Sequence, residues 1–354
     1  MTLSVAHSLH DLGWDAAWED VFEPYNRDGL LPARVAVRHH GPCELYTERG
    51  RVGGVTAGKI ADDAMPAVGD WVAARPLEGE RKALIEAVLP RRSAFTRKEA
   101  SRRTAEQVVA ANVDVVFLVS AFGRDLNPRR IERYLTAAWE SGASPVIVLN
   151  KADLAHDADA EAAPIDAVAF GVPVLRMSAA TGEGLDALEA QLGPGRTAAL
   201  LGSSGVGKST LVNRLAGREL LATREVREGD ERGRHTTTHR ELVVLPDGRG
   251  LLLDTPGMRE LQLWADGEAL DSTFAEIAEL VAECRFSDCS HEREPGCAIR
   301  RALEAGTLDR ERWDSYRKLQ RELRMLEVRQ NGRLRAEEKR KRRVFARSMR
   351  TTKW

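Results

Sequence analysis

Three patterns of hydrophobic and polar positions follow one another along the chain. Between residues 33 and 95, short β-type runs are separated by Gly and Pro, which is typical of a small β-barrel. From about residue 105, short apolar runs alternate with segments of helical periodicity, which predicts a mostly parallel sheet covered by helices on both faces. From residue 298 the periodicity is helical. We therefore expect an α/β protein with a barrel before the sheet and a mainly helical region after it.

The barrel region contains several strand-like runs whose number and size fit an OB-type barrel, although the residues alone do not separate it from an SH3-like barrel. Ahead of it, Trp14, Trp18 and Phe22 recur every four residues, which predicts a short helix packed against another element. The strand-like runs are residues 33–37, 51–55, 70–73 and 83–88.

The rest of the chain supplies the remaining predicted elements. The strands are residues 113–119, 145–149, 172–177, 198–201, 241–245 and 251–253. The helices are residues 128–140, 185–192, 209–215, 298–304 and 308–329. The last helix carries an apolar stripe of Trp313, Tyr316, Leu319, Leu323 and Leu326.

Composition favours a multi-domain cytosolic protein. The 354 residues, 43% of them hydrophobic, can build two or three domains with their own cores. We expect no membrane span, because no apolar run reaches the required length, and no signal peptide, because the start is acidic. Four cysteines, three of them clustered, do not suggest a secreted disulfide scaffold.

The formal net charge of −1 conceals a segregation of charge along the chain. Residues 331–354 hold ten Lys and Arg against two Glu. Residues 91–103 are also basic, with Phe95 among them. Either stretch is consistent with a solvated segment or with a surface that binds nucleic-acid phosphates.

A glycine-rich segment joins a predicted strand to a predicted helix in the central region. Gly202, Gly205 and Gly207 allow the backbone to wrap around phosphate oxygens with successive N–H groups directed inwards. Lys208 supplies a positive charge for the β and γ phosphates, and the Ser209 hydroxyl can coordinate Mg²⁺. The residues expected to contact the phosphates are Gly202, Ser203, Ser204, Gly205, Val206, Gly207, Lys208, Ser209 and Thr210.

Further motifs indicate a guanine nucleotide. Asn150-Lys151-Ala152-Asp153 and Ser178-Ala179 each follow a predicted strand. The Asp153 carboxylate can accept two hydrogen bonds from the guanine edge, where adenine offers no equivalent pair of donors. In Asp254-Thr255-Pro256-Gly257, Asp254 is expected to hold Mg²⁺ through water and Gly257 to donate to the γ-phosphate.

The order of these motifs is permuted. In an ordinary small GTPase the phosphate loop and the DxxG motif precede the two base-reading motifs, whereas here the base-reading motifs come first. The sequence therefore predicts a circularly permuted GTPase, in which new chain follows directly after the motif that senses the γ-phosphate.

Residues 229–240 lie where switch I is expected. Either Thr237 or Thr238 is predicted to reach Mg²⁺ and the γ-phosphate. Ras-like proteins carry a glutamine at the position of Met258, so we expect slow intrinsic hydrolysis. His235 is the candidate for orienting the attacking water once a partner orders the loop; the alternative is an ordinary polar loop residue. Potassium-using GTPases carry an asparagine at the position of Gly205, so no structural potassium site is predicted.

A cluster of potential metal ligands follows the nucleotide motifs. Three thiols and an imidazole within fourteen residues suit a closed tetrahedral Zn²⁺ site of structural rather than catalytic type. Each cysteine alone would indicate a small buried hydrophobic residue. The predicted ligands are Cys284, Cys289, His291 and Cys297.

The whole set of motifs resembles the ribosome small-subunit-dependent GTPase A family (RsgA). The likeness includes the barrel region, residues 110–114, the four permuted motifs, the 233–238 run and the Cys/His cluster. It implies an N-terminal OB-fold, a permuted GTPase and a C-terminal zinc domain. It also implies a factor of late 30S maturation that contacts 16S rRNA and hydrolyses GTP to GDP. The small subunit would stimulate this hydrolysis, and hydrolysis would release the factor from the subunit.

With this resemblance, the expected domains are a 1–32 extension, a 33–100 OB-fold, a 105–265 GTPase domain, a 266–330 zinc-binding helical domain and a 331–354 basic tail. We expect a cytoplasmic monomer without membrane contact. Three other functions stay open: a GTPase with another client such as the 50S subunit or tRNA, a non-catalytic RNA-binding scaffold, and a metabolic kinase. The intact Lys208, Ser209 and Asp254 disfavour the scaffold, and the base-reading motifs disfavour the kinase.

Overall fold

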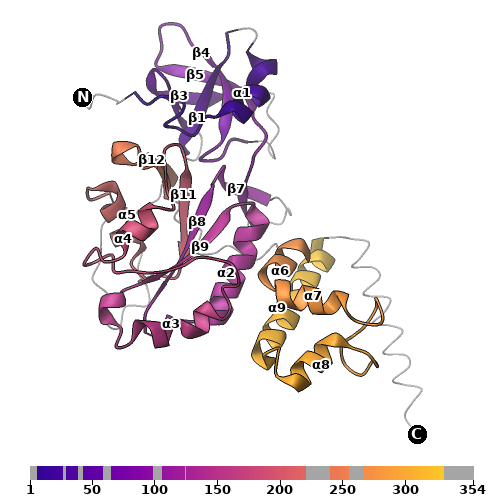
Figure 1. Cartoon of the computed structure of the whole chain (residues 1–354). Coiled ribbons are helices and arrows are strands. Elements are labelled where there is room, and N and C mark those ends of the chain that lie inside the picture. The colour runs from indigo at the N-terminus through magenta and orange to yellow at the C-terminus, as the bar shows by residue number, and fades with distance from the viewer. Residues whose placement is uncertain are drawn as a thin grey trace. The chain divides into compact units, whose positions relative to one another are not determined.

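The computed structural model describes residues 6–26, 29–38, 43–58, 65–98, 106–123, 125–220, 240–254 and 267–330 (Figure 1). It divides into two compact units, residues 1–262 and 263–354. The first unit contains a barrel and a parallel sheet, and the second is helical.

The barrel consists of β1 (Leu31–Arg38), β2 (Cys43–Thr47), β3 (Gly50–Thr56), β4 (Trp71–Pro76) and β5 (Lys82–Val88). Its strand order is β1-β2-β3-β5-β4, and a β4–β1 pairing closes it. The β4-β1-β2-β3 neighbourhood is a Greek key, so the closed five-stranded barrel is an OB-fold, as predicted. The strand β2 was not predicted, because only Cys43 and Leu45 of its five residues alternate into the barrel core.

The alternation of side chains along the barrel strands separates two cores. One face of each strand fills the barrel, as Ala33 and Val35 of β1 do. The other face of β1 and β4 belongs to the large core shared with the parallel sheet, for example through Ala36 and Trp71. Since β1 and β4 are buried on both faces, the barrel is packed firmly within its unit.

The predicted N-terminal helix is present as α1 (Ala16–Phe22) and packs on the barrel. Asp15 caps it by accepting a hydrogen bond from the Trp18 N–H at 3.0 Å. The indole of Trp14 lies edge-on to that of Trp71, with ring centroids 4.7 Å apart. The four-residue aromatic spacing was therefore a correct signal of a packed helix.

The parallel sheet has the order β10-β9-β8-β11-β13-β12. Its members are β8 (Val115–Ala121), β9 (Ser144–Asn150), β10 (Val174–Arg176), β11 (Thr197–Gly202), β12 (Arg240–Val244) and β13 (Leu251–Asp254). All neighbours are parallel except β12, which runs antiparallel to β13. These strands match the predicted ones to within a few residues.

Helices cover both faces of this sheet, as predicted. The helices α2 (Pro128–Ser141) and α3 (Ala158–Asp166) contribute to one core, and α4 (Leu185–Glu189) and α5 (Lys208–Ala216) to the other. Val116 of β8 faces the first core, and its neighbour Phe117 faces the second. Because alternate side chains are buried on opposite faces, the strands form continuous apolar runs in the sequence.

The basic stretch 91–103 is not a simple linker where the structure describes it. Residues 94–98 form β6 (Ala94–Lys98), which pairs with β7 (Glu106–Ala111) in a separate two-stranded sheet. Arg91 forms an ion pair with the buried Asp70 at 2.8 Å, and Arg92 pairs with Asp15 at 2.6 Å. Two of the arginines are therefore bound to carboxylates of the protein. Residues 99–103 lie outside the described residues.

The 110–114 segment and the barrel meet at Arg34. This buried side chain donates to the carbonyls of Leu12 and Asn112 and to the Thr197 hydroxyl at the start of β11. Burial lowers the pKa of Arg34 to about 10, against the opposing effect of Asp114. A cavity of about 400 Å³ adjoins this junction, at the amino ends of the parallel strands.

The C-terminal unit consists of α6 (Gly267–Thr273), α7 (Ala275–Ala282), α8 (Ala298–Ala305) and α9 (Arg310–Gln330). Trp313 and Tyr316 of α9 are buried, and the Tyr316 ring lies edge-on to that of Phe274 at 5.5 Å. Leu319 and Leu323 are buried as well, so the described members of the predicted apolar stripe form a packed face, and the Leu326 side chain lies outside the description. Within the residues that the structure describes, none of the helices combines the length and apolarity of a membrane span.

Candidate functional site

Those candidate nucleotide residues that the structure describes gather at one edge of the parallel sheet. Asn150, Gly202 and Asp254 are the last residues of β9, β11 and β13, and Ser178 follows β10 by two positions. The carboxyl ends of parallel strands meet at the same edge, which is where open α/β sheets bind ligands. Segments far apart in the sequence are therefore brought to one place.

Two positions of the phosphate loop leave no room for a side chain, so each requires glycine. A Cβ on Gly202 would lie 2.2 Å from the Val119 carbonyl oxygen of the neighbouring strand. Gly207 has φ +95°, and a Cβ there would lie 2.2 Å from Asn150 Nδ2. The helix α5 begins at the next residue, Lys208, so its amino end faces the loop.

Asn150 connects the base-reading and phosphate-reading segments. Its Nδ2 donates to the Val206 carbonyl at 2.8 Å, and its Oδ1 accepts from the Ala179 N–H at 2.8 Å. The side chain is buried, so both hydrogen bonds are shielded from water. The asparagine thus holds the phosphate loop and the Ser178-Ala179 loop together.

The rest of the base-reading segment is shaped by an unusual backbone. Lys151 has φ +66°, a left-handed conformation that costs a non-glycine residue on the order of 1–3 kcal/mol. It turns the chain after β9, and the Ala152 N–H then donates to the Met177 carbonyl at 3.0 Å. Asp153 follows on a short 3₁₀ turn with its side chain exposed. Ser178 is fully buried.

Lys208 is held at the mouth of the phosphate loop. Its Nζ donates to the Gly202 carbonyl at 2.7 Å and to the Ser203 carbonyl. Ser209 and Thr210 follow in the first turn of α5 and are partly exposed.

One polar network at this edge was not predicted from the sequence. Arg130 Nη1 donates to the hydroxyl of Ser203 in the phosphate loop at 2.6 Å and is ion-paired with Asp125. Asp125 in turn accepts from the Ser120 hydroxyl at 2.9 Å. The available signal was the cap Asn127 before Pro128, which places the start of α2 at the carboxyl end of β8, next to β11.

Several candidates cannot be placed. His235, Thr237, Thr238, Gly257 and Met258 lie outside the described residues, as does the basic tail 331–354. For Asp254 the structure describes the backbone position at the end of β13.

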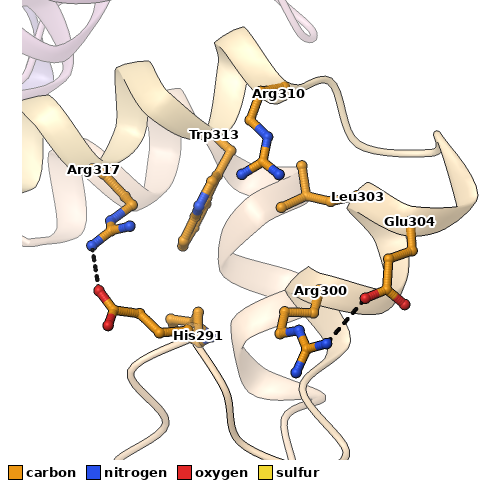
Figure 2. Close-up of a pocket in the computed structure, with 8 residues that line it drawn as sticks. His291, Arg300, Leu303, Glu304, Arg310, Trp313 and Arg317 are labelled. Atoms are coloured by element: carbon orange, nitrogen blue, oxygen red, sulfur yellow. Dashed lines mark hydrogen bonds and ion pairs between the residues drawn. The ribbon is translucent and has the colours of Figure 1, made fainter.

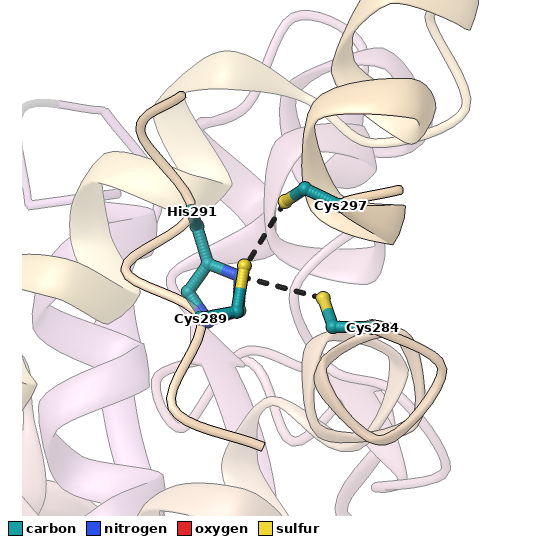
Figure 3. Close-up of side chains that lie close together, drawn as sticks. All are labelled: Cys284, Cys289, His291 and Cys297. Atoms are coloured by element: carbon teal, nitrogen blue, oxygen red, sulfur yellow. Dashed lines mark hydrogen bonds between the residues drawn. The ribbon is translucent and has the colours of Figure 1, made fainter. Parts of the chain in front are cut away.

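The four predicted metal ligands come together in the C-terminal unit (Figure 3). The donor atoms of Cys284, Cys289, His291 and Cys297 all lie within 4.8 Å of one another. His291 Nδ1 is 3.5 Å from Cys284 Sγ and 3.6 Å from Cys297 Sγ. A tetrahedral ion with bonds of about 2.3 Å to sulfur and about 2.05 Å to nitrogen places a sulfur ligand and a nitrogen ligand about 3.5 Å apart. The donor set therefore fits a tetrahedral metal ion bound through Nδ1.

The ends of two helices hold two residues of the cluster. Cys284 comes just after α7, and Cys297 is the N-cap residue of α8. Although burial opposes it, hydrogen bonds from the Ala298 and Ile299 N–H groups lower the pKa of the Cys284 thiol. The first turn of α8 thus favours the thiolate of Cys284, the form that binds metals, whereas burial and the neighbouring Cys297 raise the pKa of the Cys289 thiol to about 11.

A groove of about 500 Å³ lies beside this cluster, between α8 and α9 (Figure 2). Arg310 and the edge of Trp313 face into it, and Arg300 and Arg317 line it while paired with Glu304 and Glu292. Guanidinium groups around an aromatic ring are the side chains that nucleic-acid surfaces commonly use.

Comparison with known proteins identifies the family. The model of the family described as RsgA GTPase matches residues 88–264. The protein from Opitutus terrae named small ribosomal subunit biogenesis GTPase RsgA is 52% identical over 329 residues, which cover 89% of each chain. The Streptomyces coelicolor protein of the same name is 46% identical, covering 95% of this chain and 93% of its own.

The chain belongs to the RsgA GTPase family. The crystal structure of YjeQ from Thermotoga maritima matches with a TM-score of 0.64 and 29% identity, over 83% of this chain and 98% of that one. A structure described as YloQ, a circularly permuted GTPase, has the same fold with a TM-score of 0.62 and 24% identity, over 83% of this chain and 95% of that one.

Membership of the RsgA family confirms the prediction of a permuted GTPase. The protein is a GTP hydrolase, and it uses a guanine nucleotide with Mg²⁺, as GTPases generally do. The permuted order explains how β9 and β10 can precede the phosphate-loop strand β11 in the sequence and still lie in the same sheet.

Proposed function

We propose that this protein binds the small ribosomal subunit late in its maturation, hydrolyses GTP when the subunit stimulates it, and is released after hydrolysis. The observation that carries the proposal is the name of its relatives, small ribosomal subunit biogenesis GTPase, at 46–52% identity over most of both chains. As a factor of small-subunit assembly, the protein is proposed to work in the cytoplasm.

The proposed nucleotide roles are those expected from the sequence motifs, and the described motif residues support them by lying at one edge of the sheet. Asp153 reads the guanine edge, and Lys208 neutralises the β and γ phosphates. Ser209, Asp254 and either Thr237 or Thr238 hold Mg²⁺, which supplies charge neutralisation for the phosphates. Gly257 donates to the γ-phosphate.

His235 is proposed to orient the attacking water when the subunit is bound. Met258 has no useful hydrogen-bonding group, so another residue must supply this function. His235→Ala is expected to abolish stimulated turnover and to leave nucleotide affinity intact.

The cluster of Cys284, Cys289, His291 and Cys297 is proposed to hold one structural Zn²⁺. The support is the match of its sulfur–nitrogen distances to a tetrahedral site. All four positions are filled by protein ligands, so the ion would stabilise the second unit rather than take part in hydrolysis.

The contacts with 16S rRNA are proposed for the groove beside the metal cluster and for the basic tail 331–354. The groove is supported by Arg310 and Trp313, since Arg300 and Arg317 are paired with Glu304 and Glu292, and the tail is supported by its charge. The domain division into 1–32, 33–100, 105–265, 266–330 and 331–354, and a monomeric state without membrane contact, belong to the same proposal.

Co-sedimentation with purified subunits tests the binding and release steps. The protein with a non-hydrolysable GTP analogue is expected to pellet with 30S subunits and not with 50S subunits, and GDP is expected to weaken the 30S association at the same salt concentration. A nucleotide can shift this equilibrium only through differential binding. Equal affinity for 30S in both nucleotides would contradict coupled release, and pelleting with 50S alone would assign a different client.

A further inference from the structure

The barrel is joined directly to an edge strand of the GTPase sheet. Strand β1 pairs antiparallel with β12, with Val37 opposite Glu241 and Arg38 opposite Arg240. On its other side β12 pairs with β13, where Glu241 is opposite Asp254. A single residue of β12 therefore has the barrel on one side and the proposed Mg²⁺ aspartate on the other.

Side chains reinforce this connection. Arg51 on β3 donates from Nη2 to Glu241 Oε1 at 2.5 Å and to the Tyr46 hydroxyl at 2.9 Å. Tyr46, on β2, donates to the backbone carbonyl of Leu242 at 3.2 Å. The Tyr46 ring is buried, and the Arg51 guanidinium lies 4.8 Å from its centroid. Two adjacent residues of β12 are thus held by two strands of the barrel.

The same arginine also has a carboxylate partner inside the barrel. Arg51 Nη1 lies 3.3 Å from Glu44 Oε2, and the Glu44 and Glu241 side chains are 44% and 43% exposed. The two carboxylates are alike in charge and exposure, and they differ in which element they belong to. Glu44 lies on β2 of the barrel, whereas Glu241 lies on β12 of the GTPase sheet.

We propose that Arg51 is a positioning residue that couples the barrel to the nucleotide site through Glu241 and Tyr46. It fixes β12 against the barrel. A change of nucleotide at the carboxyl end of β13, where Asp254 lies, therefore alters the local stability of the barrel strands β2 and β3. By thermodynamic reciprocity, a partner that binds the barrel then alters the nucleotide site. The inference needs the GTPase chemistry of the family and not the identity of its client.

Amide hydrogen exchange on the full-length protein tests the coupling without any ribosomal particle. Exchange in residues 43–56 is compared in saturating GDP and in guanosine 5′-(β,γ-imido)triphosphate. In the natural protein the exchange rates are expected to differ about two- to fivefold between the nucleotides, the range of a partly exposed ion pair worth up to about 1 kcal/mol. Glu241→Gln is expected to remove most of that difference.

Glu44→Gln is the matched control and is expected to keep the nucleotide-dependent difference, since it leaves the link to β12 intact. Tyr46→Phe, which retains the ring and loses the hydroxyl bridge to Leu242, is expected to behave like Glu241→Gln. The proposal is overturned if the natural protein shows equal exchange in both nucleotides. It is equally overturned if Glu241→Gln and Tyr46→Phe both retain the natural difference, or if Glu44→Gln removes it as fully as they do. Thermal melting of each variant confirms that it is folded.

Discussion

Asn150 donates a hydrogen bond of 2.8 Å from Nδ2 to the backbone carbonyl of Val206 in the phosphate loop. Its Oδ1 holds the Ala179 N–H at the same distance. An asparagine at the end of one strand therefore organises the loops that follow two others. This role is distinct from direct contact with the base.

Replacement of Asn150 is expected to weaken GTP and GDP binding together. Asn150→Ala leaves two buried backbone groups without partners, at a cost of about 1–3 kcal/mol each, so we expect a loss of affinity of about 30-fold or more. Titration with fluorescent GDP and GTP analogues measures it. Asn150→Asp keeps the acceptor for Ala179 but places a buried carboxylate oxygen against the Val206 carbonyl, so it is expected to lose at least as much affinity as Asn150→Ala. Unchanged affinity in Asn150→Ala would show that the loops are organised independently of this side chain.

Arg130 is expected to act on the nucleotide through Ser203. The side chains of Arg130 and Asp125 are 33% and 23% exposed, so the network is worth about 1 kcal/mol and Arg130→Ala should weaken GTP binding about two- to fivefold. Ser203→Ala should have a similar effect, and the double variant should lose no more than either single one. Additive losses in this double-mutant cycle would mean that the two residues act separately. Arg129→Ala is the neighbouring control.

Zinc binding and the stability of the second unit are expected to depend on the four proposed ligands of the cluster and not on other cysteines. Cys297→Ser is expected to abolish stoichiometric zinc in the purified protein and to destabilise the second unit, because metal binding supplies much of the folding free energy of such small regions. Cys43→Ser, which changes a buried cysteine of the barrel, is expected to retain the zinc. Elemental analysis and thermal melting with and without a chelator make the comparison. Zinc retained in Cys297→Ser at full stoichiometry would contradict the assigned ligand set.

Asp15 predicts a pH-dependent contribution to the stability of the first unit. Its hydrogen bond with Arg92 holds the pKa of the carboxyl below its usual value of 3.8. Because the pKa is lowered in the folded protein, the ionised carboxyl contributes its full stabilisation at pH values above 3.8. This contribution is lost as the pH falls below that value. Asp15→Ala, which also removes the cap of α1, is expected to cost about 1 kcal/mol at pH 7.

The destabilisation by Asp15→Ala should stay constant between pH 7 and pH 5 and shrink below about pH 4, since protonation weakens the same interactions in the natural protein. Thermal melting followed by tryptophan fluorescence measures it, because Trp14 and Trp18 lie beside Asp15. Asp20→Ala, an exposed aspartate of the same helix, is the control. A difference that grows on acidification would contradict the assignment.

Elements with long or doubly buried patterns were predictable from the sequence. The strands β8, β9 and β11 are buried on both faces, so their apolar runs gave their positions closely. The helix α2 begins at Pro128 after the cap Asn127, as its sequence indicates. The Cys and His residues of the candidate metal site were predicted from spacing alone, because three thiols and an imidazole so close in sequence are typical of a metal site, and the structure brings their donor atoms together.

Other features depend on contacts between distant segments and leave little local signal. The short β2 is a strand because β1 and β3 pair with it on either side. Arg91 and Arg92 looked like part of a basic surface, whereas tertiary structure pairs them with Asp70 and Asp15. The link from Arg51 to Glu241 joins residues 190 positions apart, and only the closing of the barrel onto β12 brings them together.

The proposed function depends above all on stimulation of GTP hydrolysis by the small ribosomal subunit. Steady-state GTP turnover is therefore measured with no particle, with purified 30S subunits and with purified 50S subunits, at one fixed salt concentration. We expect slow intrinsic turnover and a stimulation of about 10²-fold or more by 30S alone, in the range of partner-supplied activation. His235→Ala should lose that stimulation. Bound GTP with turnover that 30S subunits leave unchanged would contradict the proposed function.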